Sequence, residues 1–417
     1  MNKKIRFGLI GCSKRGTGLL TGVLIPMLEE NILLCATCDK YIDRAENAAE
    51  AVEKAGYPKP FVTADYKELI AKGNLDAVII SSSWETHVEI ATAFMRAGIP
   101  VGLEVGGAYS LNDCWKLVNT YEETGTHCML LENCCYGKRE LMLLNMVRSG
   151  ILGEIVHCAG GYQHDLRSEI TGGPETKHYR FLNYLNRNCE NYPTHELGPI
   201  AKLLNINNGN RLVSLASFAS SSRGLNEYIQ KNLKSDDRLA DLEFAQGDIV
   251  TTVIKCAKGQ TIQLTLDTTL PRSYSRGFTV RGTAGSYFED TDSFFFDGEH
   301  DKFEFNGRGL WGNAAEYEEK HLHKLWRNFD PKGGHDGMDW MVLHAFFDAV
   351  EKKAKPPIDV YDTVTYMCIS ALSEESIALG GQPVAIPDFT QGKWYRRTDL
   401  CETEYALDQK QPFNEIF

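Results

Sequence analysis

The chain has 417 residues, too many for one ordinary hydrophobic core, so two or three domains are expected. Hydrophobic residues make up 43% and charged residues 24%, which is typical of a globular protein, and no stretch approaches the roughly 20 consecutive apolar residues that span a bilayer. The net charge of −12, without a Lys/Arg cluster, argues against a nucleic-acid partner.

The first elements predict a dinucleotide-binding turn. A short buried strand is predicted over Ile5–Ile10, and the glycine turn Gly11–Gly16 follows it at once. Helical apolar spacing over Thr17–Leu28 then leads to a second strand, Ile32–Cys38, which ends in Asp39. The acid lies 23 residues past the last glycine of the turn, close to the spacing of the residue that binds the ribose hydroxyls. Because a carboxylate repels a 2′-phosphate, it favours NAD over NADP.

The glycine turn is expected to hold the pyrophosphate through Gly11, Ser13, Lys14, Arg15 and Gly16. Glycine lets backbone N–H groups approach the phosphates, and the following helix presents its positive dipole end. Ser13 replaces the second glycine of the G-x-G-x-x-G pattern, and its hydroxyl can either bind a phosphate or weaken and displace the site. The alternative is an α/β domain without a ligand, in which Asp39 caps a helix or lies in a solvated loop.

Strands and helices continue to alternate up to residue 131. Helices are predicted over 45–55, up to 70, over 88–97 and over 111–124, and strands over 77–80, 100–104 and 128–131. This alternation predicts a parallel, doubly wound sheet, whose ligands lie at the carboxyl ends of the strands. The residues expected along that rim, each of which also has a purely structural interpretation, are Ser82, Trp84, His87, Glu104 and Glu132.

From residue 155 the pattern changes to longer, alternating strands. They are predicted over 156–166, 212–218, 249–255, 261–270 and 277–281, with helices near 196–204 and 338–352. Such strands indicate an open, mostly antiparallel sheet with one face packed. We therefore expect an α/β plus α+β protein, with a Rossmann domain over residues 1–136 and a substrate-binding domain over residues 137–417, joined near a helix at 140–149.

The twelve cysteines are expected to be free thiols of a cytoplasmic protein, because no signal-peptide pattern follows the basic start of the chain. Cys35 and Cys38 have the spacing of a redox or zinc pair, but on a strand residues three apart point to opposite faces. The adjacent Cys134 and Cys135 are expected to pack in the interior rather than to take part in chemistry. No metal is predicted.

A glycine-turn domain followed by an open antiparallel sheet resembles the Gfo/Idh/MocA oxidoreductases. That family usually carries Glu-Lys-Pro after the fifth strand, and its lysine serves in proton transfer. Here the position reads Glu104-Val105-Gly106, and the nearest lysine that could replace the missing one is Lys138.

A branch without that lysine, the NAD-dependent glycosidases of glycoside hydrolase family 109, is similar over most of the chain. The matching segments are 11–20, 84–87, 132–136, 160–167, 192–199, 334–339, 360–362 and 387–390. Tyr192-Pro193-Thr194-His195 is the most specific of these motifs, and Glu196 after it departs from the glycine that is usual there.

This resemblance implies a redox detour in which NAD takes a hydride from C3 of a hexoside and returns it after elimination at C1 and addition of water. It assigns His195 and Tyr192 to the C3 hydroxyl, Tyr162 as the base at C2, and Glu132, Tyr136, His164 and Arg167 to the sugar. Histidine suits such a role because it titrates near neutrality, whereas a tyrosine, with an ordinary pKa of about 10, needs that pKa lowered.

Structural alternatives remain for these residues, namely a buried hydrogen-bonded His195–Tyr192 pair, Tyr162 as a core aromatic, and Asp336 and Asp339 as caps of the helix that follows them. Two other functions also remain: a net NAD-dependent sugar or glycoside dehydrogenase, and a non-catalytic protein that binds NAD or sugar. The expected partners are a carbohydrate and further copies of the chain, as a homodimer or homotetramer paired through the open sheet.

Overall fold

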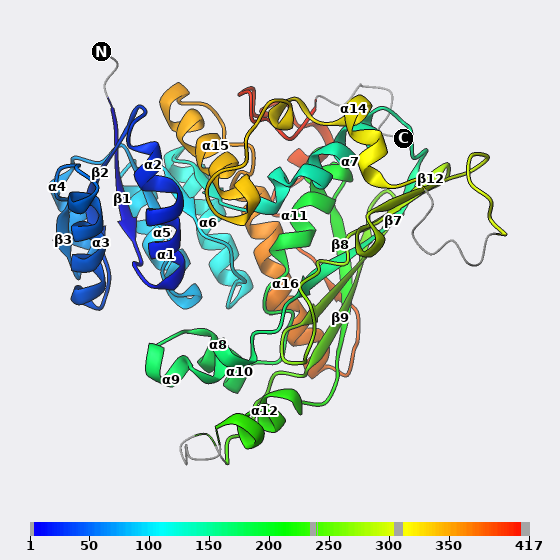
Figure 1. The fold of residues 1–417 in the computed structure, drawn as a ribbon, viewed down its shortest axis with the longest axis horizontal. Coiled ribbons are helices and arrows are strands. Elements are labelled where there is room, and N and C mark those ends of the chain that lie inside the picture. Colours follow the sequence, from blue (N-terminus) through cyan, green and yellow to red (C-terminus); the bar gives the residue numbers. More distant parts are fainter. Residues whose placement is uncertain (1–3, 234–238, 240, 304–311, 410–417) are drawn as a thin grey trace.

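The computed structural model describes residues 4–233, 239, 241–303 and 312–409, which form two sheets with helices around them (Figure 1). The first sheet has six parallel strands in the order β3-β2-β1-β4-β5-β6. The second has eight strands in the order β13-β12-β11-β7-β10-β9-β8-β14, all antiparallel to their neighbours except β7 and β10. The predicted pairing of a doubly wound sheet with an open, mostly antiparallel sheet is confirmed.

The elements of the first sheet and its connections follow in chain order. They are β1 (Ile5–Ile10), α1 (Lys14–Leu19), the π-helical turn η1 (Leu20–Leu24), α2 (Ile25–Met27), β2 (Ile32–Cys38), α3 (Ile42–Lys54), β3 (Phe61–Thr63), α4 (Tyr66–Lys72), β4 (Ala77–Ile80), η2 (Trp84–Thr86), α5 (His87–Arg96), β5 (Val101–Leu103), α6 (Leu111–Thr124), β6 (Cys128–Leu130), η3 (Asn133–Tyr136) and α7 (Lys138–Arg148).

The second sheet is interrupted by several helices. The elements are β7 (Ile155–Gln163), α8 (Arg167–Thr171), α9 (Gly173–Thr176), α10 (Arg180–Asn186), α11 (Thr194–Leu203), β8 (Leu212–Ala219), α12 (Gly224–Asn232), β9 (Ile249–Cys256), β10 (Thr261–Asp267), β11 (Thr279–Gly282), β12 (Gly285–Phe288), η4 (Glu289–Thr291), β13 (Ser293–Phe296), η5 (Ala314–Tyr317), α14 (Glu318–His321), η6 (Lys324–Trp326), η7 (His335–Gly337), α15 (Met338–Lys352), α16 (Val360–Ala378), β14 (Val384–Ala385) and η8 (Lys393–Arg396).

The first sheet is covered partly by helices that come from the end of the chain. Phe347 of α15 meets Phe7 of β1 with ring centroids 5.1 Å apart, and a Cβ at Gly102 of β5 would lie 3.2 Å from the ring of Phe346. Figure 1 shows α15 beside the N-terminal helices. The helix α16 contacts both β6 of the first sheet and β8 of the second, so the two sheets share a helix between them.

The longest helix, α16, was not predicted. Most of its 19 residues are buried, so it has no polar face from which a helical period can be recognised. The short helices α8 to α10, α12 and α14 and the short strands β3, β12, β13 and β14 were also missed. Four predicted bounds were wrong by three residues: the first helix begins at Lys14 and α3 at Ile42, and β7 ends at Gln163 and β10 at Asp267. Among the described residues, none of the helices has both the length and the apolar character needed to cross a membrane.

A buried ion cluster fastens α11 to α16 and to the C-terminal segment. The ammonium of Lys202 lies 2.7 Å from Asp362 and 2.8 Å from Asp408, and it also donates to the carbonyl of Pro357 at 2.9 Å. Lys202 and Asp362 are buried, so removing the cation leaves carboxylates uncompensated in the interior.

We therefore expect Lys202→Met to lower the free energy of unfolding by about 3–5 kcal/mol, the usual cost of breaking a buried ion pair from one side. Chemical denaturation followed by circular dichroism measures the change. The matched control is Lys116→Met, which removes a surface ion pair in which the ammonium lies 2.9 Å from Asp113. It should change the free energy of unfolding by no more than about 1 kcal/mol. Equal midpoints for the two variants would contradict the assignment.

Candidate active site

The glycine turn lies at the carboxyl ends of β1 and β4, and its geometry requires glycine at two positions. Gly11 has φ +87°, and a Cβ there would lie 2.4 Å from the carbonyl of Ser81. A Cβ at Gly16 would lie 1.9 Å from the carbonyl oxygen of Gly11. Backbone therefore approaches backbone at this edge, as a dinucleotide site requires.

Three polar groups at the same edge fit a dinucleotide. The carboxylate of Asp39, at the end of β2, accepts the backbone N–H groups of Cys12 at 2.7 Å and Tyr41 at 2.9 Å, and each oxygen keeps a lone pair for another donor. Ser13, at the start of α1, makes no side-chain capping bond within the described chain. The buried hydroxyl of Ser81 likewise has no hydrogen-bond partner among the described residues.

Arg15 ties the turn to the far end of the chain. Its guanidinium donates to both oxygens of Asp339 at 2.8 Å, and it lies 2.9 Å from Glu104, which was also predicted at the cofactor site. His335 lies 2.8 Å from Asp339 as well. The prediction that Asp339 caps a helix was wrong, because its carboxylate is engaged with Arg15 and holds segment 334–339 against the glycine turn.

His87 lies in the interior, although it was predicted on the rim. It is buried, its Nε2 lies 3.0 Å from the carbonyl of Ser82, and burial lowers its pKa to about 4. The imidazole is therefore neutral near pH 7 and fixes the segment after β4. Trp84, from the same motif, does contact Tyr192, one of the predicted catalytic residues described below.

A lobe formed by α8, α9 and α10 lies across the carboxyl end of β1 (Figure 1). Three contacts tie this lobe to the first sheet's edge. They are Lys14 to Glu169 at 2.8 Å, Arg44 to the carbonyl of Thr176 at 2.8 Å, and the ammonium of Lys177 over the ring of Tyr41 at 4.1 Å. The lobe therefore covers the edge at which the glycine turn and Asp39 lie.

The predicted catalytic residues come together between the two sheets. Nδ1 of His195, on α11, lies 2.8 Å from Oε1 of Glu132, which follows β6. The ring centroid of Tyr192 is 4.8 Å from that of His195 and 4.4 Å from that of Tyr162 on β7. Trp84 is 5.6 Å from Tyr192, so the cluster adjoins the rim of the first sheet.

The His195–Glu132 pair fixes a tautomer. Burial alone would raise the pKa of Glu132, but the adjacent His195 outweighs it and lowers that pKa, so the carboxylate is ionised. It accepts a hydrogen bond from Nδ1–H of His195, and this leaves Nε2 of the imidazole to accept a proton. Both residues are buried, which keeps bulk water from competing for that proton.

Tyr162 does not have the lowered pKa that a free tyrosinate base needs. Burial raises its pKa, and the guanidinium of Arg180, 5.9 Å from the ring centroid, only partly opposes this. Its hydroxyl lies 3.0 Å from Nδ1 of His164, whose pKa is lowered by burial and by Arg180. A neutral His164 can therefore accept the phenolic proton, so Tyr162 and His164 form a second proton-accepting pair.

Two residues of the site were missed by the sequence reasoning. Arg180, at the start of α10, is buried, lies 5.0 Å from the ring centroid of Tyr192, and has no hydrogen-bond partner for Nη1 among the described residues. Tyr274, from the loop between β10 and β11, lies 5.2 Å from the ring of His164. Neither follows a strand end or belongs to a quoted motif, so their positions come from tertiary structure alone.

Three residues proposed from the sequence lie away from the cluster. Tyr136 is fully buried and donates its hydroxyl hydrogen to the carbonyl of Tyr405, so its prediction as a sugar contact was wrong. The guanidinium of Arg167 forms an ion pair, at 2.7 Å, with the carboxylate of the neighbouring Asp165. Lys138 is paired with Glu318 at 2.6 Å on the surface of α7 and does not replace the missing lysine.

Ligand atoms of Glu132, Cys134 and His195 lie within 4.8 Å of one another. The imidazole and the carboxylate bind each other, Cys134 donates its thiol hydrogen to Oδ1 of Asn133 at 3.6 Å, and burial raises the pKa of that thiol well above its usual range. A metal needs the thiolate form, so these contacts favour the proton-transfer pair and we assign no metal here.

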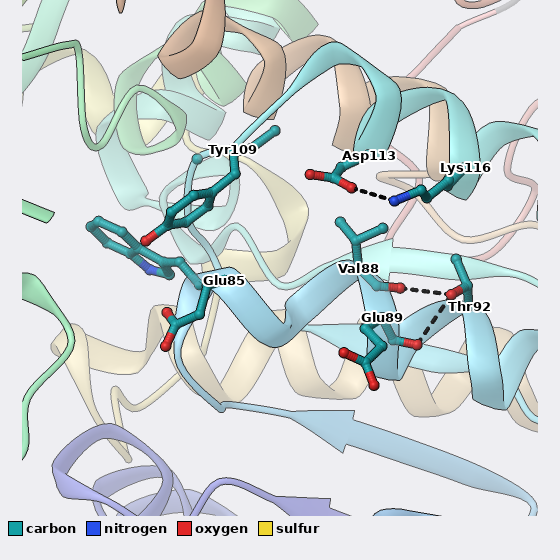
Figure 2. A pocket seen from close by; sticks show the side chains of 10 residues that line it. Glu85, Val88, Glu89, Thr92, Tyr109, Asp113 and Lys116 are labelled. Atoms are coloured by element: carbon teal, nitrogen blue, oxygen red, sulfur yellow. Dashed lines mark hydrogen bonds and ion pairs between the residues drawn. The ribbon is translucent and has the colours of Figure 1, made fainter. Parts of the chain in front are cut away.

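A separate pocket of about 310 Å³ opens between α5 and α6 and shares only Trp84 with the catalytic cluster. Figure 2 shows the carboxylates of Glu85, Glu89 and Asp113 around it, the last of them paired with Lys116. Its lining offers no proton-accepting pair like the one that His195 forms, so the chemistry is assigned to the cluster.

Family models match both parts of the chain. The model described as "Oxidoreductase family, NAD-binding Rossmann fold" matches residues 5–131, and "Glycosyl hydrolase 109, C-terminal domain" matches residues 136–396. The first model bears out the prediction of NAD as the cofactor.

Two curated relatives are similar over almost the whole chain. An alpha-N-acetylgalactosaminidase of Tannerella forsythia is 38% identical, covering 94% of this chain and 88% of that protein. A glycosyl hydrolase family 109 protein of Parabacteroides distasonis is 38% identical, covering 97% and 90%. Among solved structures, an inositol dehydrogenase homolog complexed with NAD⁺ from Azotobacter vinelandii has the same fold, with a TM-score of 0.67 at 16% identity over 93% of this chain and 98% of that chain.

We expect Asp39→Asn to weaken NAD binding about tenfold, because it removes a charge-assisted hydrogen bond of about 1.5 kcal/mol to the ribose, and to reduce the preference for NAD over NADP. Calorimetric titration of the cofactor-stripped protein measures both affinities. Asp43→Asn, an exposed carboxylate of α3, is the matched control and should change neither. Equal wild-type affinities for NAD and NADP would contradict the role of Asp39.

Proposed function

Because the chain belongs to glycoside hydrolase family 109, within the NAD-binding oxidoreductase family, we propose that it cleaves a hexoside and ends each turnover with its NAD unchanged. The observation that carries this proposal is the buried His195–Glu132 pair against Tyr162 and Tyr192, next to the rim where NAD binds. Two proton-accepting pairs at one site suit a reaction that removes protons from two positions of a sugar.

NAD, when bound, supplies the hydride acceptor for C3 of the sugar and the donor that restores C3 at the end. His195 acts on the C3 hydroxyl. Its Nε2 accepts the hydroxyl proton as the hydride leaves, and the ionised Glu132 stabilises the imidazolium that forms. The imidazolium holds this proton in a buried site. It can therefore return the proton to the C3 oxygen when the ketone is reduced.

Tyr162 acts at C2, where the C3 ketone has made the proton acidic. The phenolic oxygen accepts the C2 proton while its own proton passes to Nδ1 of His164, 3.0 Å away. This relay makes a free tyrosinate unnecessary, which agrees with the raised pKa of Tyr162. The substituent on C1 then leaves by elimination, and water adds to C1 before the protons return.

Arg180 and Tyr274 hold the sugar rather than move its protons. Nη1 of Arg180, which has no partner within the described part of the chain, offers a donor to a sugar hydroxyl or to an amide carbonyl on C2. Val105 stands where net dehydrogenases of the wider family carry their lysine, and it is buried and apolar. The proton transfers are therefore assigned to the histidine pairs.

The test is to incubate the protein in D₂O with nitrophenyl glycosides of both anomers, beginning with the α-N-acetylgalactosaminide named by one relative. We expect release of nitrophenol, deuterium at C2 of the sugar product, and no accumulation of NADH. His195→Ala should lower kcat by about 10³-fold or more, since a general base contributes roughly 10²–10⁴-fold.

Release of nitrophenol without deuterium at C2 would exclude elimination. Formation of NADH in proportion to substrate, without nitrophenol, would instead establish a net dehydrogenase. Bound NAD with neither product from any glycoside of the panel would favour a sugar-binding protein.

We also propose that two copies of the chain pair through the open face of the second sheet. Strand register places Ala216, Val253, Gln263, Ala159 and Thr279 in one row across five strands. None of them is charged, and the side chain of Val253 is 46% exposed. This row of uncharged side chains favours a protein partner over bulk water, while Lys255 and Arg281 of the next row on the same face lie beside it.

Light scattering on the wild type is expected to give the mass of a dimer or of a tetramer built from such dimers. Val253→Asp should shift that mass to the monomer, because it introduces a charge into the centre of the interface. Val156→Asp, an equally exposed valine on the opposite side of the sheet, is the control and should keep the wild-type mass. A monomeric wild type would refute the pairing.

A further inference from the structure

Glu196, the residue after His195 on α11, is fully buried, and neither of its carboxylate oxygens has a hydrogen-bond partner among the described residues. The mechanism proposed above does not use it. An unpaired ionised carboxylate in such a place costs several kcal/mol, so its surroundings must either neutralise it or keep it protonated.

Among the described residues, one cation, Arg276, serves Glu196 and two carboxylates next to it. The guanidinium of Arg276 forms a close ion pair with Glu140, lies 3.6 Å from Glu289, and approaches Glu196 only to 3.8 Å. Glu289 in addition accepts two backbone N–H groups, at 2.7 and 3.2 Å. Glu196 has the weakest contacts of the three, so it is the acid that most favours keeping its proton, although burial also raises the pKa of Glu289.

The other titratable groups around Glu196 do not change this conclusion. Burial, with the neighbouring carboxylates, raises the pKa of Glu196 well above its usual range, and only Arg276 opposes this. The groups that face it from the packed elements are Glu140 on α7, Glu132 and Cys134 at η3, Cys158 on β7, Tyr274 and Arg276 before β11, and Glu289 on η4.

The side chain of Glu196 also occupies the space next to a glycine of β7. A Cβ at Gly160 would lie 1.9 Å from Cγ of Glu196 and 2.9 Å from its Cβ. Gly160 precedes Tyr162 by two residues on the strand, and Glu196 follows His195 directly on the helix. The Gly160–Glu196 contact therefore lies between the two elements that carry the proposed bases, whose ring centroids are 5.5 Å apart.

We propose that Glu196, as a neutral acid seated against Gly160, is a positioning residue that sets the spacing of His195 and Tyr162. The role in catalysis rests on the proposed function. A neutral Glu196 also avoids a second negative charge beside Glu132, whose own charge holds His195.

The test is a double-mutant cycle across the contact. Gly160→Ala inserts a methyl group between α11 and β7, and the two elements must move apart to make room for it. We expect it to lower kcat tenfold or more while KM changes less than threefold. Adding Glu196→Gly removes the obstructing atoms and should restore most of kcat. Adding Glu289→Gln instead alters the same charged cluster away from the contact and should restore none of it.

The charge state is tested with Glu196→Gln, which has nearly the same shape but cannot ionise. At neutral pH we expect kcat within about twofold of the wild type. The folded wild type keeps the Glu196 proton, whereas the unfolded chain releases it above its ordinary pKa of about 4.3, so stability falls as pH rises above that value. Between pH 5 and 9 the Tm of the wild type should therefore fall more than that of Glu196→Gln.

Crystal structures of Gly160→Ala and of the double variant test the positioning without any activity measurement. We expect the separation of the His195 and Tyr162 rings to increase in the first and to return toward 5.5 Å in the second. Unchanged ring separation and kcat in Gly160→Ala, equal rescue by Glu289→Gln, or parallel Tm curves for wild type and Glu196→Gln would each overturn the proposal. A wild type that cleaves no glycoside would refute the proposed function, while the structures and Tm curves would still decide the role of Glu196 in spacing and its protonation.

Discussion

The hydrogen bond between Glu132 and His195 connects the two halves of the molecule at the point where their chemistry must meet. Glu132 is fixed by the end of a parallel strand of the first sheet, and His195 by a helix that packs on the second. Because both groups are buried, neither can be lost without leaving the other unsatisfied in the interior. In the proposed reaction, the contact that joins the two halves is thus also the one that holds the catalytic histidine.

Three buried carboxylates near the candidate catalytic cluster perform different tasks. Asp339 and Glu132 have a cation or imidazole within 2.8 Å, which lowers their pKa and keeps them charged, and each fixes another functional side chain. Among the described residues Glu196 shares Arg276 with two better-placed acids, and in its proposed role it stays protonated and fills space in place of a charge. Among these three carboxylates, the distance to the nearest cationic partner separates Asp339 and Glu132 from Glu196.

The sequence predicted the first sheet well because its signals are local. A glycine turn, buried strands and a terminal acid each depend on a few neighbouring residues, and His195, Tyr192, Tyr162, Glu132 and His164 do meet in the structure. The predictions that failed concerned features that depend on tertiary contacts. The helix α16 is buried all round and so lacks a period, and Arg180 reaches the site from a short helix that no pattern marks. Tyr136 was misplaced because membership of a motif does not fix the direction of a side chain.

The ties of the α8–α10 lobe have a consequence for how the protein is made. Every strand of the first sheet lies before residue 131, whereas the lobe and the segment at 334–339 are synthesised later. Domains generally fold from the N-terminus during synthesis, so the glycine turn and Asp39 exist before anything covers them. While those later segments are still being made, the edge of the sheet that carries the glycine turn is not yet covered by them.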